Sequence, residues 1–164
     1  MYEKYGEFDS AEELNQKANE LKAEGDRDGV IALAEENGLD TEDAADFYDG
    51  KIEELTTPIL AALGKIAAES AKLEMFGVFD DWAAEMIALC TEEEEFAKAV
   101  RRKGKNLTSC FAAVILEESK KRKNVDSKIV QKIREKEKDF PMGFQISTMT
   151  KKEQMTVIRK YYEG

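Results

Sequence analysis

Histidine is absent from this sequence of 164 residues, and proline and cysteine are scarce, with two of each. Without histidine the chain lacks the commonest general base and the commonest zinc ligand, and it cannot form a Ser-His-Asp triad. It also contains no glycine-rich phosphate loop, no CxxC motif and no HExxH motif. We therefore expect a protein that is not an enzyme and that binds no cofactor and no metal.

The two cysteines, Cys90 and Cys110, each lie in a segment of apolar periodicity. This favours buried thiols over a disulfide or a redox pair. The N-terminal residues are polar and do not have the pattern of a signal peptide. The apolar runs are too short and too interrupted to span a membrane. The sequence thus predicts a soluble cytoplasmic protein that makes no membrane contact.

The scarcity of proline favours helices, and residues that typically begin helices recur at short intervals. These starts are Asp9-Ser10, Thr41, Thr57-Pro58, Thr91, Asn106, Asp126 and Thr150. The sequence predicts a mainly α protein, a compact bundle of about eight or nine short helices, with at most a minor strand near residues 142–148.

The helical pattern also makes three specific predictions about where a helix ends, how one begins and which residues are buried. The helix that starts at Thr57-Pro58 is expected to run to Gly77. Thr91 is expected to form a capping box with Glu94. In the helix that starts at Asp126, the spacing of the apolar residues predicts that Ile129, Val130 and Ile133 are all buried.

Charge divides the chain almost in two. Residues 1–95 hold 27 Asp and Glu against 7 Lys and Arg, a net charge of −20, and residues 96–164 hold 8 against 18, a net charge of +10. We expect an acidic helical lobe over 1–90 and a basic helical lobe over 91–164, with a hinge near 89–91, in what is most simply one compact unit. Such a separation gives two opposite binding faces.

The charged clusters of the two lobes are the candidate binding residues. The acidic candidates for a partner protein are Asp80, Asp81, Glu92, Glu93, Glu94 and Glu95. The basic candidates for nucleic acid or a partner are Arg101, Arg102, Lys103, Lys105, Lys120, Lys121, Arg122 and Lys123. A solvated charged face is the simpler alternative, and the helix macrodipole alone explains acids at the start and bases at the end of one helix.

Two helices over 106–123 and 126–138 also suggest a helix-turn-helix that contacts DNA. Four glutamates interrupt this basic region, and the second helix contains no asparagine for base recognition. The pattern therefore favours contacts with phosphates over base readout.

One stretch resembles a known family. The run from Gly104 to Cys110 is followed by an apolar helix, a basic turn and the run from Val125 to Ile129. In this arrangement, residues 96–140 resemble the PcfK-like family. These small proteins are carried on conjugative and other mobile elements, and one member acts like an anti-CRISPR protein against the type II CRISPR nuclease. The resemblance implies such an inhibitory role. From their places in the helical pattern, we interpret the matched residues as a helix cap and a core face. They are Gly104, Lys105, Asn106, Leu107 and Cys110.

We therefore predict a non-enzymatic binding protein of a phage or mobile element. The leading hypothesis is an anti-CRISPR-type inhibitor whose partner is a nucleic-acid-binding protein, such as a type II CRISPR nuclease, with weak nucleic-acid contact as a further expectation. The alternative is a nucleic-acid-binding accessory or regulatory protein of a conjugative element. A third reading is a scaffold that self-associates head to tail, and a homodimer is also compatible with the sequence.

Overall fold

The computed structural model describes residues 3–164, which form nine helices and one small two-stranded sheet. The elements are α1 (Ala11–Ala23), α2 (Arg27–Glu36), α3 (Thr41–Tyr48), α4 (Pro58–Ser70), α5 (Val78–Glu92), α6 (Glu94–Arg101), α7 (Leu107–Lys120), β1 (Arg122–Asn124), α8 (Ser127–Arg134), β2 (Gln145–Ser147) and α9 (Lys151–Glu163). The predicted mainly α fold with a minor strand is confirmed.

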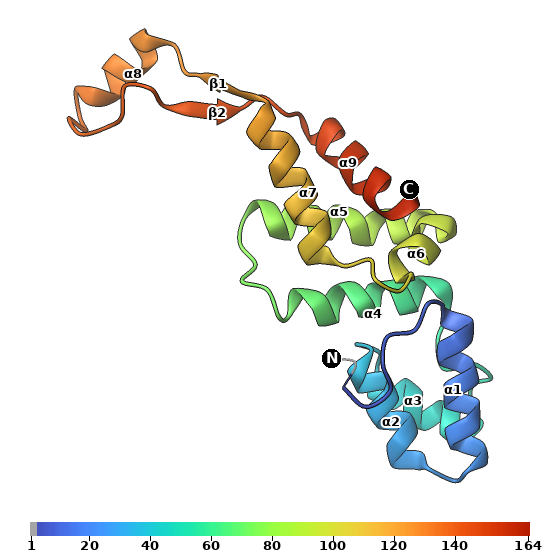
Figure 1. The fold of residues 1–164 in the computed structure, drawn as a ribbon. Coiled ribbons are helices and arrows are strands. Elements are labelled where there is room, and N and C mark those ends of the chain that lie inside the picture. Colours follow the sequence, from blue (N-terminus) through green and yellow to red (C-terminus); the bar gives the residue numbers. More distant parts are fainter. Residues whose placement is uncertain (1–2) are drawn as a thin grey trace.

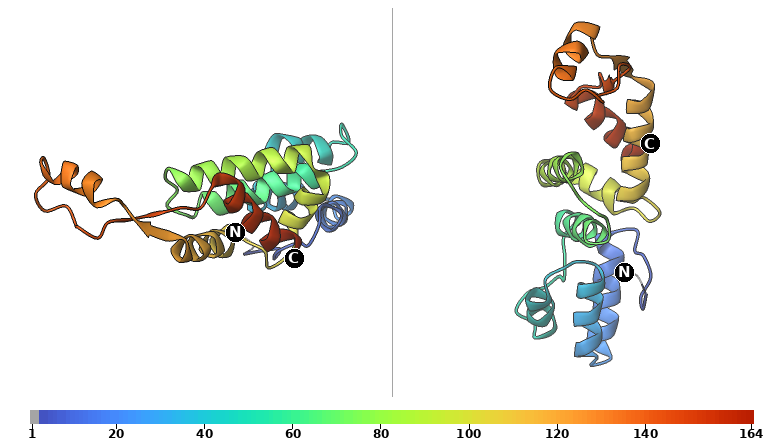
Figure 2. Two further views of the ribbon diagram at one scale, coloured as in Figure 1. Left: turned by 90° about the horizontal axis from the view of Figure 1, so that it is seen from above. Right: turned by 90° about the vertical axis from the view of Figure 1, so that its left-hand side faces the viewer.

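The elements follow one another along an elongated molecule (Figure 1). Residues 3–57, with α1 to α3, form one end, which we call the acidic end. Helices α4 to α7 and α9 form the body. Residues 121–148, with β1, α8 and β2, project from the body as an arm, and the view from the side shows the same order (Figure 2).

Local capping explains where most helices begin. The side chains of Ser10, Thr57 and Asn106 each accept a hydrogen bond from the backbone N–H three residues on, at 2.8–3.2 Å. Thr150 and Glu153 form a reciprocal capping box at the start of α9. These helix starts, as read from the sequence, are confirmed.

The predicted capping box of Thr91 with Glu94 is wrong. Helix α5 continues through Thr91, whose hydroxyl donates to the carbonyl oxygen of Ile87 at 2.9 Å, and α6 begins only after Glu93. A hydroxyl that bonds back to the preceding turn is compatible with an uninterrupted helix. Residues 89–91, where a hinge was expected, are therefore helical throughout.

Two further predictions are corrected by packing. Helix α4 ends at Ser70 rather than at Gly77, because the chain then turns to pack Leu73 and Met75 against the core of the body. In α8 only Val130 is buried, Ile133 is half-buried, and Ile129 is 56% exposed. No other helix of residues 3–164 packs extensively against α8, so it lacks a surface on which to bury a full apolar face.

Two hydrophobic clusters meet at α4. One lies within the acidic end and includes Leu14, Leu33 and Phe47. The other lies in the body and is centred on aromatic side chains of α5, α6, α7 and α9, namely Trp82, Phe96, Phe111 and Tyr162. Helix α4 contributes to both clusters, Ala61 to the first and Ala62 and Ile66 to the second.

The approach of α4 to the turn between α2 and α3 depends on two glycines. A Cβ atom on Gly64 would lie 2.6 Å from the carbonyl oxygen of Asn37 and 3.0 Å from that of Gly38. Gly38 has a φ of +68°, and its own Cβ would lie 2.3 Å from the carbonyl oxygen of Gly64. Because the obstructing atoms belong to the backbone, the acidic end and α4 must separate to admit a side chain.

Replacing Gly64 by alanine is therefore expected to destabilise the protein by about 1–3 kcal/mol, the usual range for overpacking a filled interior. Urea unfolding monitored by circular dichroism measures the change. Gly143→Ala is the matched control, since no atom lies within 4 Å of a Cβ at Gly143. Equal stabilities of the two variants would contradict the close approach.

Candidate functional site

Charge is distributed unevenly along the molecule. The acidic end, residues 3–57, holds 18 Asp and Glu and 5 Lys and Arg, a net charge of −13. The arm, residues 121–148, holds 8 Lys and Arg and 4 Asp and Glu, a net charge of +4, and the remaining residues are close to neutral at −1. Because the acidic end and the arm lie at opposite ends of the fold (Figures 1 and 2), the molecule has a strong dipole along its length.

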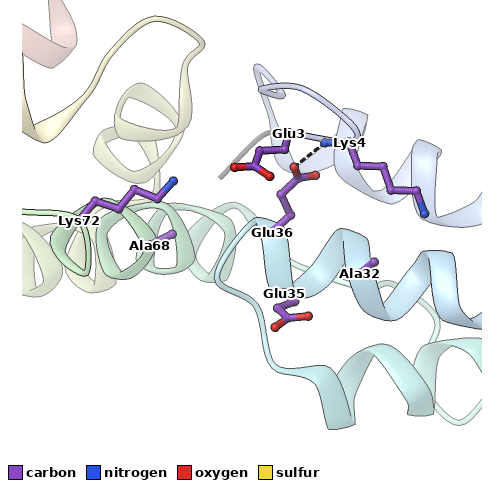
Figure 3. Close-up of a pocket in the computed structure, with 7 residues that line it drawn as sticks. All are labelled: Glu3, Lys4, Ala32, Glu35, Glu36, Ala68 and Lys72. Atoms are coloured by element: carbon purple, nitrogen blue, oxygen red, sulfur yellow. Dashed lines mark hydrogen bonds between the residues drawn. The ribbon is translucent and has the colours of Figure 1, made fainter.

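An open pocket of about 520 Å³ lies where the acidic end meets α4 (Figure 3). Its wall combines residues of the N-terminal segment, α2 and α4: Glu3, Lys4, Ala32, Glu35, Glu36, Ala68 and Lys72. The carboxylate of Glu36 accepts the backbone N–H groups of Lys4 and Tyr5 at 2.7 and 3.2 Å. The lining contains no hydroxyl, thiol or imidazole, so the pocket offers a surface of carboxylate and ammonium groups.

The acidic residues singled out in the sequence do not form one patch. Asp80 and Asp81 lie in the first turn of α5, whereas Glu92 to Glu95 lie at its other end, about 20 Å away along a helix of 15 residues. Glu93 pairs with Arg159, which lowers the pKa of the Glu93 carboxyl. Glu94 and Glu95 both pair with Lys98, at 2.9 and 2.8 Å. Three of these six carboxylates are thus already engaged within the body.

Among the basic residues singled out, Arg101 is not on the surface. It is 1% exposed, and its Nη2 atom donates to Oδ1 of Asn37 at 2.7 Å across the junction with the acidic end. Its burial removes Arg101 from any surface that binds a partner. Lys105 is half-buried and donates to the carbonyl oxygen of Tyr161 at 2.6 Å.

The exposed basic candidates fall into two groups. Arg102 and Lys103 lie just before α7, and the cluster of Lys120 to Lys123 begins at the last residue of α7 and continues beyond it. The 14 residues of α7 place these groups about 20 Å apart. They therefore do not form a single patch.

The arm gathers cations that the sequence-based candidates left out: Lys128, Lys132, Arg134, Lys136 and Lys138. The available signal was their polar places in the periodicity of the helix expected over 126–138, although α8 itself ends at Arg134. Of the arm's eight cations, only Lys121 and Lys132 have a carboxylate within 4 Å among residues 3–164. The arm is thus the part of the described chain where positive charge is least compensated.

The suggested helix-turn-helix is not formed. Strand β1 follows α7 directly, α8 lies at the tip of the arm, and α7 and α8 do not pack together. Recognition by two adjoining helices is therefore excluded for these segments.

The base of the arm is fixed to α9. Thr148 donates both its backbone N–H, at 2.9 Å, and its hydroxyl, at 2.7 Å, to the carbonyl oxygen of Lys121. The Lys121 ammonium lies 2.6 Å from the carboxylate of Glu153. This ammonium, together with the N–H and hydroxyl of Thr150, lowers the pKa of Glu153 to about 2.

Buried polar contacts join the acidic end to the body. Nζ of Lys65, in α4, donates to Glu7 and to the carbonyl oxygen of Arg102, both at 2.8 Å. The second carboxylate oxygen of Glu7 accepts the N–H of Gly104 at 3.0 Å. Burial lowers the pKa of Lys65 and raises that of nearby Glu69, although Glu69 accepts the N–H of Leu107 at 2.6 Å.

The two cysteines are free and buried, as predicted. Burial raises the pKa of both Cys90 and Cys110 to about 12, so neither thiol is activated as a nucleophile. Across residues 3–164 no group of three or more Cys, His, Asp or Glu side chains is placed to hold a metal ion. None of the helices in that range has the length and apolar character needed to cross a bilayer.

Comparison of the chain with protein-family models, with curated proteins and with solved structures gave no match. The candidate site therefore rests on the charge and geometry described above.

Glu7→Gln keeps the size of the side chain but removes the carboxylate charge that pairs with the Lys65 ammonium, at a position 1% exposed. Breaking a buried ion pair usually costs about 3–5 kcal/mol. Because the Glu7 side chain is itself 20% exposed, we expect about 2–3 kcal/mol in urea unfolding. The exposed Glu53→Gln should change stability by no more than about 0.5 kcal/mol. Similar small losses in both variants would mean that the pair does not hold the junction.

The capping box also predicts a pH dependence. Because the pKa of Glu153 is depressed in the folded state, its stabilising effect is present above pH 4.5 and is lost as the pH falls toward 2. The difference in unfolding free energy between the wild type and Glu153→Gln should therefore shrink on acidification through this window. A difference that stays constant with pH would contradict the assignment.

Proposed function

We propose that this chain acts by binding, as an inhibitor of a nucleic-acid-guided nuclease, and that its acidic end occupies a basic groove that otherwise holds nucleic acid. The observation that supports this is the concentration of a net charge of −13 in residues 3–57, at one end of the molecule. Such a concentration destabilises a folded lobe through self-repulsion, so it calls for a reason outside folding.

The construction of the acidic end suits this role. Its carboxylates are carried on three short helices packed around one hydrophobic cluster, so they are held at fixed spacings. Glu24, Glu53 and Glu54 are exposed and form no ion pair within the described chain. A basic groove that binds phosphates would find preorganised negative charge there.

The resemblance of residues 96–140 to the PcfK-like family supports the same proposal, including an origin in a phage or mobile element. Asn106 caps α7, and Leu107 and Cys110 are buried beneath it. The matched residues are thus a helix cap and a core face rather than a contact surface.

A second function is favoured by the arm, whose cations are largely unpaired. In this alternative the protein is a nucleic-acid-binding accessory of a conjugative element, and the arm rather than the acidic end makes the principal contact. Opposite charges at the two ends would also support head-to-tail association between copies.

Competition for nucleic acid separates these functions. Adding the protein to a type II CRISPR nuclease loaded with guide RNA should prevent target DNA from binding, because the acidic end and DNA compete for one groove. The association rate should fall as salt rises, since screening weakens attraction between opposite charges. DNA loading at the control rate would reject the inhibitor and favour the accessory protein.

Charge reversal tests which surface is used. Glu53→Lys/Glu54→Lys should slow association with the nuclease by about tenfold or more, because electrostatic steering changes on-rates by about 10- to 1000-fold. The control Glu74→Lys/Glu163→Lys makes the same change in net charge on the body. Equal effects of the two variants, with both folded by circular dichroism, would assign the effect to net charge and not to the acidic end.

A further inference from the structure

The arm contains an exposed two-stranded antiparallel ribbon. Strand β1 pairs with β2 in the register Arg122 with Ser147, Lys123 with Ile146, and Asn124 with Gln145. All six residues are exposed, and Ile146 is 51% exposed. A backbone hydrogen bond of 2.9 Å from Val125 to the carbonyl oxygen of Phe144 extends the ribbon toward the tip.

The register divides these six residues between two faces. Side chains directly opposite one another in an antiparallel pair share a face, and successive residues alternate between faces. One face therefore carries Arg122, Asn124, Gln145 and Ser147, and the other carries Lys123 and Ile146. A hydrogen bond of 2.9 Å from Nε2 of Gln145 to Oδ1 of Asn124 is consistent with this division.

The chemistry of the first face is that of base recognition. Arginine pairs with guanine in two-point contact, asparagine and glutamine pair with adenine, and serine bonds to either. The Nδ2 group of Asn124 and the Oε1 atom of Gln145 make no other hydrogen bond among residues 3–164. Together they offer the donor and the acceptor that complement adenine N7 and N6.

We infer that this ribbon enters the major groove of duplex DNA and reads base pairs through Arg122, Asn124 and Gln145. Three residues per strand span about 10 Å, which matches a major groove about 12 Å wide that admits a two-stranded ribbon. The inference goes beyond the proposed inhibition by the acidic end and rests on the alternative function, in which the arm contacts nucleic acid. It names duplex DNA as the ligand and gives the arm sequence preference rather than phosphate attraction alone.

Cations in the part of the arm beyond the strands are placed to contact the phosphates. Lys121, at the base of the ribbon, is already paired with Glu153, whereas Lys128, Lys136 and Lys138 lie beyond the strands. These last three have no carboxylate partner within the described chain. Phosphate contacts fix the register of a protein on DNA, whereas contacts with base edges specify the sequence.

The net negative charge of the chain does not oppose this contact. The acidic end alone carries −13, against −10 for the whole chain, and it lies at the far end of the molecule from the ribbon (Figure 1). At physiological ionic strength the Debye length is about 8 Å, so distant charges are largely screened. The local charge of the arm then determines the interaction with DNA.

The test uses the full chain without a nuclease. Duplexes that bind the protein are selected from a library of random sequences at about 50 mM salt, where phosphate contacts are strong. The expected result is enrichment of a short motif of about three base pairs, the length of duplex that about 10 Å of ribbon covers. No enrichment, or no duplex binding at this salt, would overturn the inference. Binding to phosphatidylserine vesicles in place of DNA would also overturn it.

Arg122→Lys separates base readout from charge. Lysine keeps the positive charge but loses the rigid two-point geometry of the guanidinium. The preference for the selected duplex over a scrambled one should fall by about 5- to 150-fold, with binding to the scrambled duplex unchanged. Asn124→Ala/Gln145→Ala should reduce the preference in the same way.

Lys136→Ala/Lys138→Ala is the matched control for phosphate binding. It should weaken binding to both duplexes equally and reduce the salt dependence by about 0.9 log units for each phosphate that is no longer neutralised. If Arg122→Lys also weakens both duplexes equally, the ribbon does not read bases. Because no nuclease is present, a failure here leaves the competition experiment on the acidic end unaffected.

Discussion

Helix α4 is buried against both hydrophobic clusters, and the arrangement of the whole molecule depends on that double packing. Ala61 packs into the acidic end, while Ala62 and Ile66 pack into the body. Small residues and Gly64 allow close approach on one side. The Lys65 ammonium then crosses to Glu7 and to backbone carbonyls at the junction. A buried ammonium needs all of these partners at once, so it favours a single relative placement of the two parts.

This placement has a consequence for electrostatics. A charge of −13 on a lobe of this size is unfavourable, and the packing of α1 to α3 against α4 must offset the repulsion. The arm is built differently, since Val130 is its only fully buried hydrophobic residue. The acidic end is therefore a packed surface that holds charges at fixed positions, whereas the arm relies on the hydrogen bonds at its base. The two ends therefore differ both in the sign of their charge and in how they are held in place.

Local chemistry made much of the fold predictable from the sequence. Ser10, Thr57, Asn106 and Thr150 begin helices because their side chains satisfy free N–H groups, a signal within four residues. The predictions that were wrong concern helix ends and helix interruptions that depend on packing between residues far apart in the sequence. The end of α4 depends on where Leu73 and Met75 meet the body, and Thr91 lies within a helix that its own propensity would interrupt.

The candidate site was less predictable for the same reason. Arg101 looks like a surface cation in sequence, yet it bonds to Asn37, 64 residues away. Strand β2 falls in the segment where a minor strand was expected, but β1 escaped notice because it is three polar residues with no alternation of apolar side chains. The register of the ribbon depends on two segments about 20 residues apart in the chain.

The fold holds the acidic end and the arm apart despite their opposite charges. A distance measurement between spin labels on the two ends tests this most directly. Labels at Glu54→Cys and Lys138→Cys lie on exposed positions of the two ends, and the buried Cys90 and Cys110, each with its pKa raised to about 12, should remain unlabelled. In dilute protein we expect one narrow distribution of long distances that does not change with salt. A short-distance population at low salt that disappears at high salt would show the arm folded onto the acidic end and would contradict the account.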